Sequence, residues 1–229
     1  MLPTLFHLIA SVVYAFVFYY DQNYLDIPFP KEYLGYPLKG RFVFLTFWCL
    51  ALQNLYYPIA LINDLIGTNA YQPRKPPLIR KLKDLMFSLL FPVSTYVSAA
   101  FWGIYFVDKD MVFPEALEKA MPVWVNHTIH TLIIVTANLE ILLFNITYPS
   151  KKVGIFVNLV FNVSYAVWIH IIYFNTGIWV YPLFQAFNWP LRIIYVTISL
   201  AIGIVLYLTG NGINSQVTKS RKTSKTKSQ

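Results

Sequence analysis

Long apolar runs separated by short polar segments occupy almost the whole chain of 229 residues. A helix needs about 20 apolar residues to cross the hydrocarbon of a bilayer. The runs are continuously apolar, without the alternation that is typical of strands in a membrane β-barrel. The sequence therefore predicts an all-α fold, a polytopic membrane bundle of six transmembrane helices. The six apolar stretches are 2–20, 42–64, 85–107, 122–144, 153–174 and 190–209.

The segments between these runs are short and rich in Pro, Gly and Asn, as in YQPRKPP and NTGIWVYP, so they leave no room for a soluble domain. Composition agrees, because 57% of the residues are hydrophobic and only 12% are charged, which excludes an ordinary soluble protein. We expect one six-helix transmembrane catalytic domain, residues 1–212. A basic, disordered cytosolic tail, residues 213–229, should follow it.

The positions of Lys and Arg predict the orientation of the bundle. If the six spans alternate in direction, the N-terminus, 65–84, 145–152 and the tail lie on one side of the membrane. The positive-inside rule places the side with more Lys and Arg in the cytosol, so both termini are expected to be cytosolic. That side holds Arg74, Lys75, Arg80, Lys81, Lys83, Lys151, Lys152, Lys219, Arg221, Lys222, Lys225 and Lys227, and the other side only Lys31, Lys39, Arg41, Lys109, Lys119 and Arg192.

The net charge of +8 is explained by this topology and by attraction to anionic lipids, so we expect no nucleic-acid partner. The tail ends with Lys225 and Lys227 in a K-x-K-x-x arrangement, similar to the retrieval signal on endoplasmic-reticulum membrane proteins. We therefore expect an integral protein of the endomembrane system, in the endoplasmic reticulum, with the plasma membrane as the alternative. The sequence does not indicate a protein partner.

Two polar residues lie within apolar runs: Thr46 in FVFLTFWCLALQ and His130 in PVWVNHTIHTLIIV. Both spans enter from the non-cytosolic side, which places Thr46 about 7 Å and His130 about 12 Å below that surface at about 1.5 Å per residue. A hydroxyl and an imidazole at similar depth are the smallest nucleophile and base pair that can cleave an ester. We therefore expect a lipid hydrolase with Thr46 and His130 as catalytic residues.

His127 and His130 are three residues apart and share a helical face, which would suit a metal. We find no third ligand of suitable type at this depth, and Cys49 is the only cysteine. We therefore predict neither a metal site nor a cofactor.

Three acidic residues, Asp64, Asp84 and Glu140, fall near the cytosolic ends of their spans. We expect them to form a structural cluster with Lys81 and Lys83. They lie on the wrong side of the membrane to orient His130.

Other polar residues in the spans are better explained by helix packing, because membrane-embedded hydroxyls and amides often bond a neighbouring helix. We assign this role to Gln53, Ser94 and Thr95, and also to His170; His7 has no predicted role. Candidates to orient His130 are Asn126, Tyr173, Asn175 and Tyr181, and the sequence does not choose among them.

Five segments resemble one family over nearly the whole chain: LTFWCLALQ, KDLMFSLLFPVST, FPEALEKAMPVWVNHTIHT, YPSKKVG and NTGIWVYP. This is the family of androgen-induced and androgen-dependent TFPI-regulating proteins. The resemblance implies a six-span membrane enzyme that hydrolyses fatty acid esters of hydroxy fatty acids (FAHFA). It also implies a threonine nucleophile and a histidine, which match Thr46 and His130, whereas Asn126 and His127 match motif positions without an assigned role.

A branched lipid ester would then enter from the bilayer, which avoids moving its acyl chains into water. Two alternatives stay open at this point, a small-molecule transporter and a non-catalytic membrane regulator. A transporter would carry polar residues through the full membrane depth or broken helices in two corresponding halves. A regulator would keep its effect after Thr46→Ala.

Overall fold

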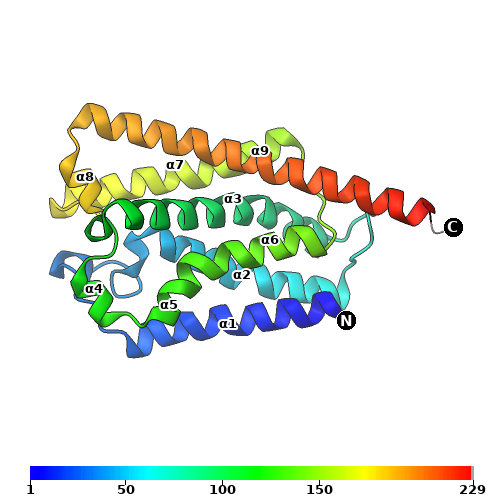
Figure 1. Cartoon of the computed structure of the whole chain (residues 1–229), viewed down its shortest axis with the longest axis horizontal. Coiled ribbons are helices and arrows are strands. Elements are labelled where there is room, and N and C mark those ends of the chain that lie inside the picture. The colour runs from blue at the N-terminus through cyan, green and yellow to red at the C-terminus, as the bar shows by residue number, and fades with distance from the viewer. Residues whose placement is uncertain (228–229) are drawn as a thin grey trace.

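The structure, a computed structural model, describes residues 1–227, with side chains through Lys222, and no strand occurs in this range. Five of its helices are long and apolar enough to cross a membrane. They lie side by side, with the N-terminus and the end of the last helix on the same side of the bundle (Figure 1). The predicted all-α membrane bundle is therefore confirmed. The five helices are α1 (Leu2–Tyr24), α2 (Leu45–Ile66), α3 (Leu78–Val107), α7 (Lys151–Thr176) and α9 (Trp189–Lys227).

The remaining predicted span, 122–144, is helical but is divided into three parts: α5 (Val123–His127), a π-helical turn η4 (Thr128–Leu132) and α6 (Ile133–Leu143). None of the three parts has the length of a membrane span on its own. Length and composition therefore identify five candidate spans, and the sixth crossing stays a prediction. Single π-helical turns within α-helices often occur at functional sites.

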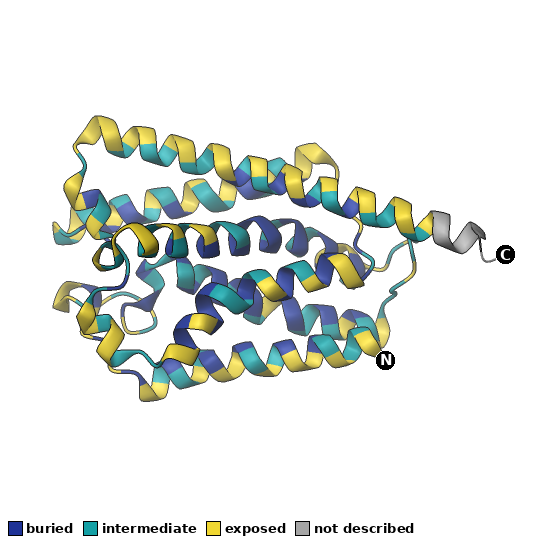
Figure 2. Cartoon of the chain, in the orientation of Figure 1, coloured by how far each residue is buried: buried dark blue, intermediate teal, exposed yellow. Residues whose placement is uncertain are grey.

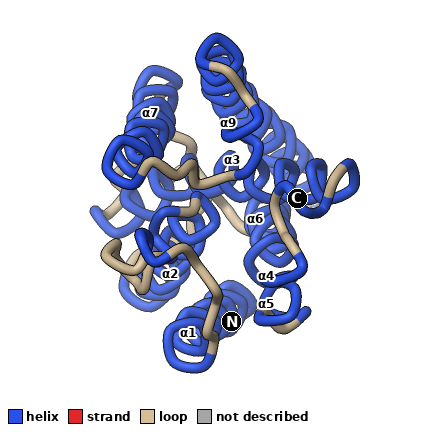
Figure 3. The backbone as a smooth tube through the Cα atoms, turned by 90° about the vertical axis from the view of Figure 1, so that its left-hand side faces the viewer, coloured by secondary structure: helices blue, strands red, loops and turns tan. Residues whose placement is uncertain are grey.

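α3 lies at the centre of the bundle, between α2, α6, α7 and α9 (Figure 3). In the most apolar part of each helix, 56% of the α3 residues are buried, against 11% for α9. Figure 2 shows the same gradient, with exposed and intermediate residues predominating on α1 and α9 and buried residues gathered on the inner helices. Exposed apolar side chains on α1, α7 and α9 are those expected to face lipid.

The connections at the end of the bundle away from the termini contain short helical elements. These elements lie at the end of the bundle where α2 begins and where α5 and η4 carry the predicted site residues. They are η1 (Lys31–Tyr33), η2 (Arg41–Val43), η3 (Lys109–Met111), α4 (Glu115–Ala120) and α8 (Pro182–Ala186).

Glycines allow α9 to approach its neighbours closely. A Cβ added to Gly154 of α7 would overlap the buried ring of Tyr207 in α9, and one added to Gly210 of α9 would contact Phe91 of α3 at 2.6 Å. Small residues of this kind are typical of contacts between membrane helices.

At the end of the bundle that holds the N-terminus, four ionisable side chains are buried in contact with one another. They belong to His7, Asp64, Lys83 and Glu140 and are here called the charge cluster. His7 Nδ1 lies 2.7 Å from Asp64 Oδ2, and His7 Nε2 lies 2.8 Å from Glu140 Oε2. Lys83 Nζ lies 3.2 Å from Glu140 Oε1, which also accepts a 2.8 Å hydrogen bond from Tyr56. The cluster joins α1, α2, α3 and α6.

The predicted acidic cluster is confirmed in part: Lys83 pairs with Glu140 as predicted, whereas Asp84 has a different partner. Asp84 pairs with Arg80, at 2.8 Å, and Lys81 is exposed. The predicted pairing of Lys81 with the acidic cluster was wrong because the preceding residue, Arg80, lies on the inner face of α3 at this turn. Arg80 is fully buried and donates to the carbonyls of Thr68 and Asn145.

Part of the segment expected to be a disordered tail is helical, because α9 continues past residue 212 to Lys227. Tertiary contacts account for the difference. Asn214 donates to the carbonyl of Ile146, and Arg221 donates to the carbonyls of Phe144 and Leu142 at the end of α6. A cation at a helix C-terminus is favourable because unpaired carbonyls gather there. Residues 228–229 lie outside the described part.

Candidate active site

Thr46 is the second residue of α2, directly after a turn fixed by side chains from α7 and its following loop. The amide of Leu45 donates to the hydroxyls of Tyr165 and Tyr181, at 2.9 and 3.1 Å. The carbonyl of Phe42 accepts from the indoles of Trp48 and Trp168. These bonds position the first turn of α2.

His130 lies at the middle of the π-helical turn η4 and faces the start of α2. Its Nε2 is 3.2 Å from Oγ1 of Thr46, although the two residues are 84 positions apart in the chain. His130 is buried and Thr46 is half-buried. The structure therefore brings the two sequence-predicted residues into hydrogen-bond contact.

Asn126 contacts the second ring nitrogen of the imidazole. His130 Nδ1 lies 2.7 Å from Oδ1 of Asn126 and 3.1 Å from its backbone oxygen. Both oxygens can only accept, so we assign the proton to Nδ1, which leaves the Nε2 lone pair toward Thr46. This is the tautomer that can accept the threonine proton, and among the four orienting candidates it is Asn126 that makes the contact.

The ring of Phe101 fixes the plane of the imidazole. The two ring centroids are 3.6 Å apart, with an angle of 8° between the planes. A stacked face and a bonded Nδ1 leave His130 little rotational freedom, so Nε2 stays directed at Thr46. Sequence reasoning missed Phe101, because it lies on another helix among many aromatic residues of α3.

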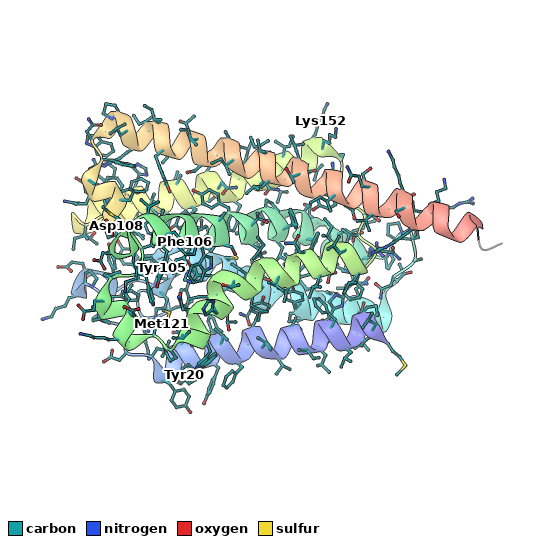
Figure 4. All side chains as sticks on the ribbon, in the orientation of Figure 1. Tyr20, Tyr105, Phe106, Asp108, Met121 and Lys152 are labelled. Atoms are coloured by element: carbon teal, nitrogen blue, oxygen red, sulfur yellow. The ribbon has the colours of Figure 1, made fainter. Side chains whose placement is uncertain are left out.

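Thr46 and His130 line a cavity of about 630 Å³. This volume is typical of small-molecule sites, which span about 300–1,000 Å³. The walls are mostly apolar side chains from α3, α7 and α9 and from the short elements at the same end of the bundle. In Figure 4 the cavity-lining Met121 lies near that end, together with Asp108, whereas Lys152 points outward from the start of α7.

Several other sequence candidates lie away from this pair. His127 is exposed and contacts Thr131 at 3.1 Å, so it does not join His130. Gln53 bonds Ser94 at 2.8 Å, in agreement with the predicted packing role. Asn175 is exposed, and Tyr173 stacks on Trp179. In residues 1–227 no group of three or more His, Cys, Asp or Glu side chains is arranged to hold a metal.

His7 is the second residue that sequence reasoning missed. It belongs to the charge cluster at the opposite end of the bundle and contacts residues 57 and 133 positions away. A signal was available, because a lone histidine in an apolar span at the depth of Asp64 and Glu140 needs a polar partner.

Comparison with known proteins places the chain among membrane proteins of one family. A model of the FAR-17a/AIG1-like protein family matches residues 2–215. The androgen-dependent TFPI-regulating protein of Homo sapiens is 31% identical over 213 residues, which cover 92% of this chain and 90% of the relative. The androgen-induced gene 1 protein of Homo sapiens is 31% identical over 207 residues, with 87% and 86% covered.

A more distant relative is the UPF0641 membrane protein of Schizosaccharomyces pombe, 22% identical over 204 residues, with 88% of this chain and 85% of the relative covered. No solved structure matches the chain significantly. The names of these relatives state no reaction, whereas the family match over residues 2–215 includes both predicted site residues. The chain belongs to the FAR-17a/AIG1-like protein family.

Proposed function

We propose that this protein is an intramembrane lipid ester hydrolase that cleaves fatty acid esters of hydroxy fatty acids. Thr46 is the nucleophile and His130 is the general base. The observation that carries the proposal is the 3.2 Å contact between Thr46 Oγ1 and His130 Nε2 at the wall of an apolar cavity.

The reaction follows from this geometry. As Thr46 Oγ attacks the ester carbonyl, its proton passes to His130 Nε2. The imidazolium then protonates the leaving hydroxyl of the hydroxy fatty acid, and an acyl-threonine stays behind. Water, activated by the same imidazole, releases the fatty acid and restores Thr46. Asn126 holds the imidazole in the reactive tautomer throughout.

The oxyanion of the tetrahedral intermediate needs hydrogen-bond donors. Gln53 and Asn126 do not line the cavity. Tyr181 does line it, and its hydroxyl accepts from the amide of Leu45, beside Thr46, at 3.1 Å and pairs with the hydroxyl of Tyr165 at 2.9 Å. This hydroxyl serves the oxyanion when its proton turns from Tyr165 to the substrate. Burial raises the pKa of Tyr181 to about 12, so this hydroxyl keeps its proton at physiological pH. We assign Tyr181 as the oxyanion donor.

The cavity suits a lipid because its walls are apolar and it lies among helices that face the bilayer. Keeping acyl chains in an apolar environment avoids a cost of about 0.8 kcal/mol for each CH₂ moved into water. A lipid ester can therefore reach Thr46 from the membrane.

The positions of the charged residues support six crossings with both termini in the cytosol. The N-terminus and the end of α9 at Lys227 lie at the same end of the bundle, as an even number of crossings requires (Figure 1).

The test is ester hydrolysis by the purified protein in detergent, with an ester of palmitic acid and hydroxystearic acid as substrate. Thr46→Ala and His130→Ala should each lower acid release to background, while Thr46→Ser keeps measurable turnover. His127→Ala is the matched control, because this exposed imidazole lies outside the cavity and should leave activity unchanged. Equal acid release by Thr46→Ala, or none by the wild type, would overturn the hydrolase and favour the regulator.

A further inference from the structure

One residue of the cavity wall, Trp179, carries a buried side-chain nitrogen without a hydrogen-bond partner. Among the buried side-chain nitrogen and oxygen atoms of the described residues that lack a hydrogen-bond partner, only Nε1 of Trp179 belongs to a residue that lines this cavity. Trp179 is 4% exposed. A buried donor without an acceptor is unfavourable because it has lost its hydrogen bonds to water, so the missing partner is best supplied by a ligand.

The neighbours of Trp179 hold its ring in a fixed place. The ring of Tyr173 stacks on it at 4.0 Å, and the ring of Phe184 lies 5.3 Å away at 30°. Tyr33 donates to the backbone carbonyl of Trp179 at 3.0 Å. Because stacking occupies the ring face and the backbone is also bonded, the indole is a preorganised donor.

The charge beside Trp179 indicates which acceptor it prefers. The guanidinium of Arg192 lies 4.6 Å from the centroid of the Trp179 ring and donates through Nε to the carbonyl of Phe184. Within residues 1–222 no carboxylate forms an ion pair with Arg192. A positive charge without a counter-ion favours a negatively charged acceptor over a neutral one.

We propose that the cavity holds a lipid with two separate polar groups, and that Trp179 Nε1 donates a hydrogen bond to its free carboxylate while the ester lies at Thr46. Trp179 is thus a specificity-determining residue, and Arg192 strengthens the site through its charge. The inference rests on the proposed function and names the feature of the substrate that is recognised. An ester of the same length without the carboxylate lacks an acceptor for Trp179.

The experiment compares two substrates of the purified full-length protein. One is the ester of palmitic acid with hydroxystearic acid, and the other is the ester of palmitic acid with the matching secondary alcohol that lacks the carboxyl group. Trp179→Phe keeps an aromatic ring but removes the N–H, and should raise KM for the first ester about 10-fold, as expected for a hydrogen bond to a charged group. KM for the second ester and kcat for both should stay near the wild-type values.

Trp189→Phe is the matched control. Trp189 belongs to the same aromatic group and also lies under Arg192, at 5.1 Å, but it does not line the cavity. It should leave both KM values unchanged. Should Trp179→Phe not fold, Arg192→Gln provides the second variant and should raise KM for the first ester only. Equal changes for the two esters in the folded variants would overturn the proposal.

Binding separates this inference from the proposed reaction. Thr46→Ala keeps the cavity but lacks the nucleophile, so it should bind the radiolabelled carboxylate ester more tightly than the carboxyl-free ester. Trp179→Phe in this background should remove the preference. If the wild type hydrolyses neither ester but the preference is found, the reaction is wrong and the site stands; absence of any preference contradicts the site itself.

Discussion

The chemistry at Thr46 depends on which nitrogen of His130 carries its proton. The Nδ1 contact with Asn126, at 2.7 Å, decides this, because the amide oxygen can only accept. An asparagine one turn before a histidine does not by itself orient the imidazole. Asn126 orients the imidazole here because the π-helical turn and the ring of Phe101 both restrict its rotation.

Replacing Asn126 tests this role. Asn126→Ala should lower kcat by about 10- to 100-fold, within the range of general base effects, with KM nearly unchanged. Asn126→Asp retains an acceptor oxygen and should restore most of the activity. The measurement is steady-state hydrolysis of the hydroxystearate ester. Equal losses in the two variants would indicate that Asn126 serves only the fold.

The Tyr181 hydroxyl is the second residue-scale test. Tyr181→Phe should lower kcat by about 100-fold, as found when one oxyanion donor is removed. Tyr96→Phe is the control, since Tyr96 also lines the cavity but bonds Ser199 on α9. If both variants retain wild-type kcat in the same assay, Tyr181 is not the donor.

Among the elements, the segment Val123–Leu143 shows what sequence patterns can and cannot predict. Its apolar run predicts a membrane helix, and its depth places His130 in the same half of the bilayer as Thr46. The π-helical turn η4 was not predicted, because it depends on how this segment packs on α3 and α2. Choosing Asn126 among the four candidates requires knowing how the helix is rotated about its axis, and residue spacing alone does not show this.

The charge cluster was predicted in part for the same reason. Periodicity places Asp64 and Glu140 near one surface of the membrane, but the pairing of His7 with both requires the arrangement of α1, α2 and α6. Contacts between distant parts of the chain are fixed by tertiary packing, and a single sequence does not show them.

Glu140 should be important for stability because it bonds His7, Lys83 and Tyr56 with no exposure to solvent. Glu140→Leu leaves these buried polar groups without their shared partner and should lower the free energy of unfolding by about 3–5 kcal/mol. Thermal unfolding in detergent measures the effect. Glu118→Gln is the control, because its pair with Lys109 is exposed and should contribute nothing measurable. A Glu140→Leu protein as stable as the wild type would contradict a stabilising role for the cluster.

On the scale of the whole molecule, we expect the cavity end of the bundle to face the lumen and the termini to face the cytosol. Single cysteines at Lys152 and Glu118 test it, because both positions are exposed and Cys49 is buried. In sealed microsomes a membrane-impermeant maleimide should label Lys152→Cys directly and Glu118→Cys only after detergent is added. The reverse pattern would invert the topology, and labelling of both without detergent would refute a membrane barrier between them.

The all-α membrane architecture followed from the sequence because bilayer thickness fixes helix length. The helix direction that the positions of Lys and Arg indicate stays a prediction. The cavity did not, since its lining comes from residues distributed between Ile27 and Leu200. Residue types can suggest the reaction, but the space that admits a lipid exists only in the folded bundle.

The most direct test of the central claim is to locate the acyl group during turnover. The purified protein is mixed with the hydroxystearate ester, quenched with acid, digested and examined by mass spectrometry. We expect a palmitoyl group on Thr46 in the wild type and none at this position in Thr46→Ala. A palmitoyl group on another residue, or wild-type acid release by Thr46→Ala, would contradict it.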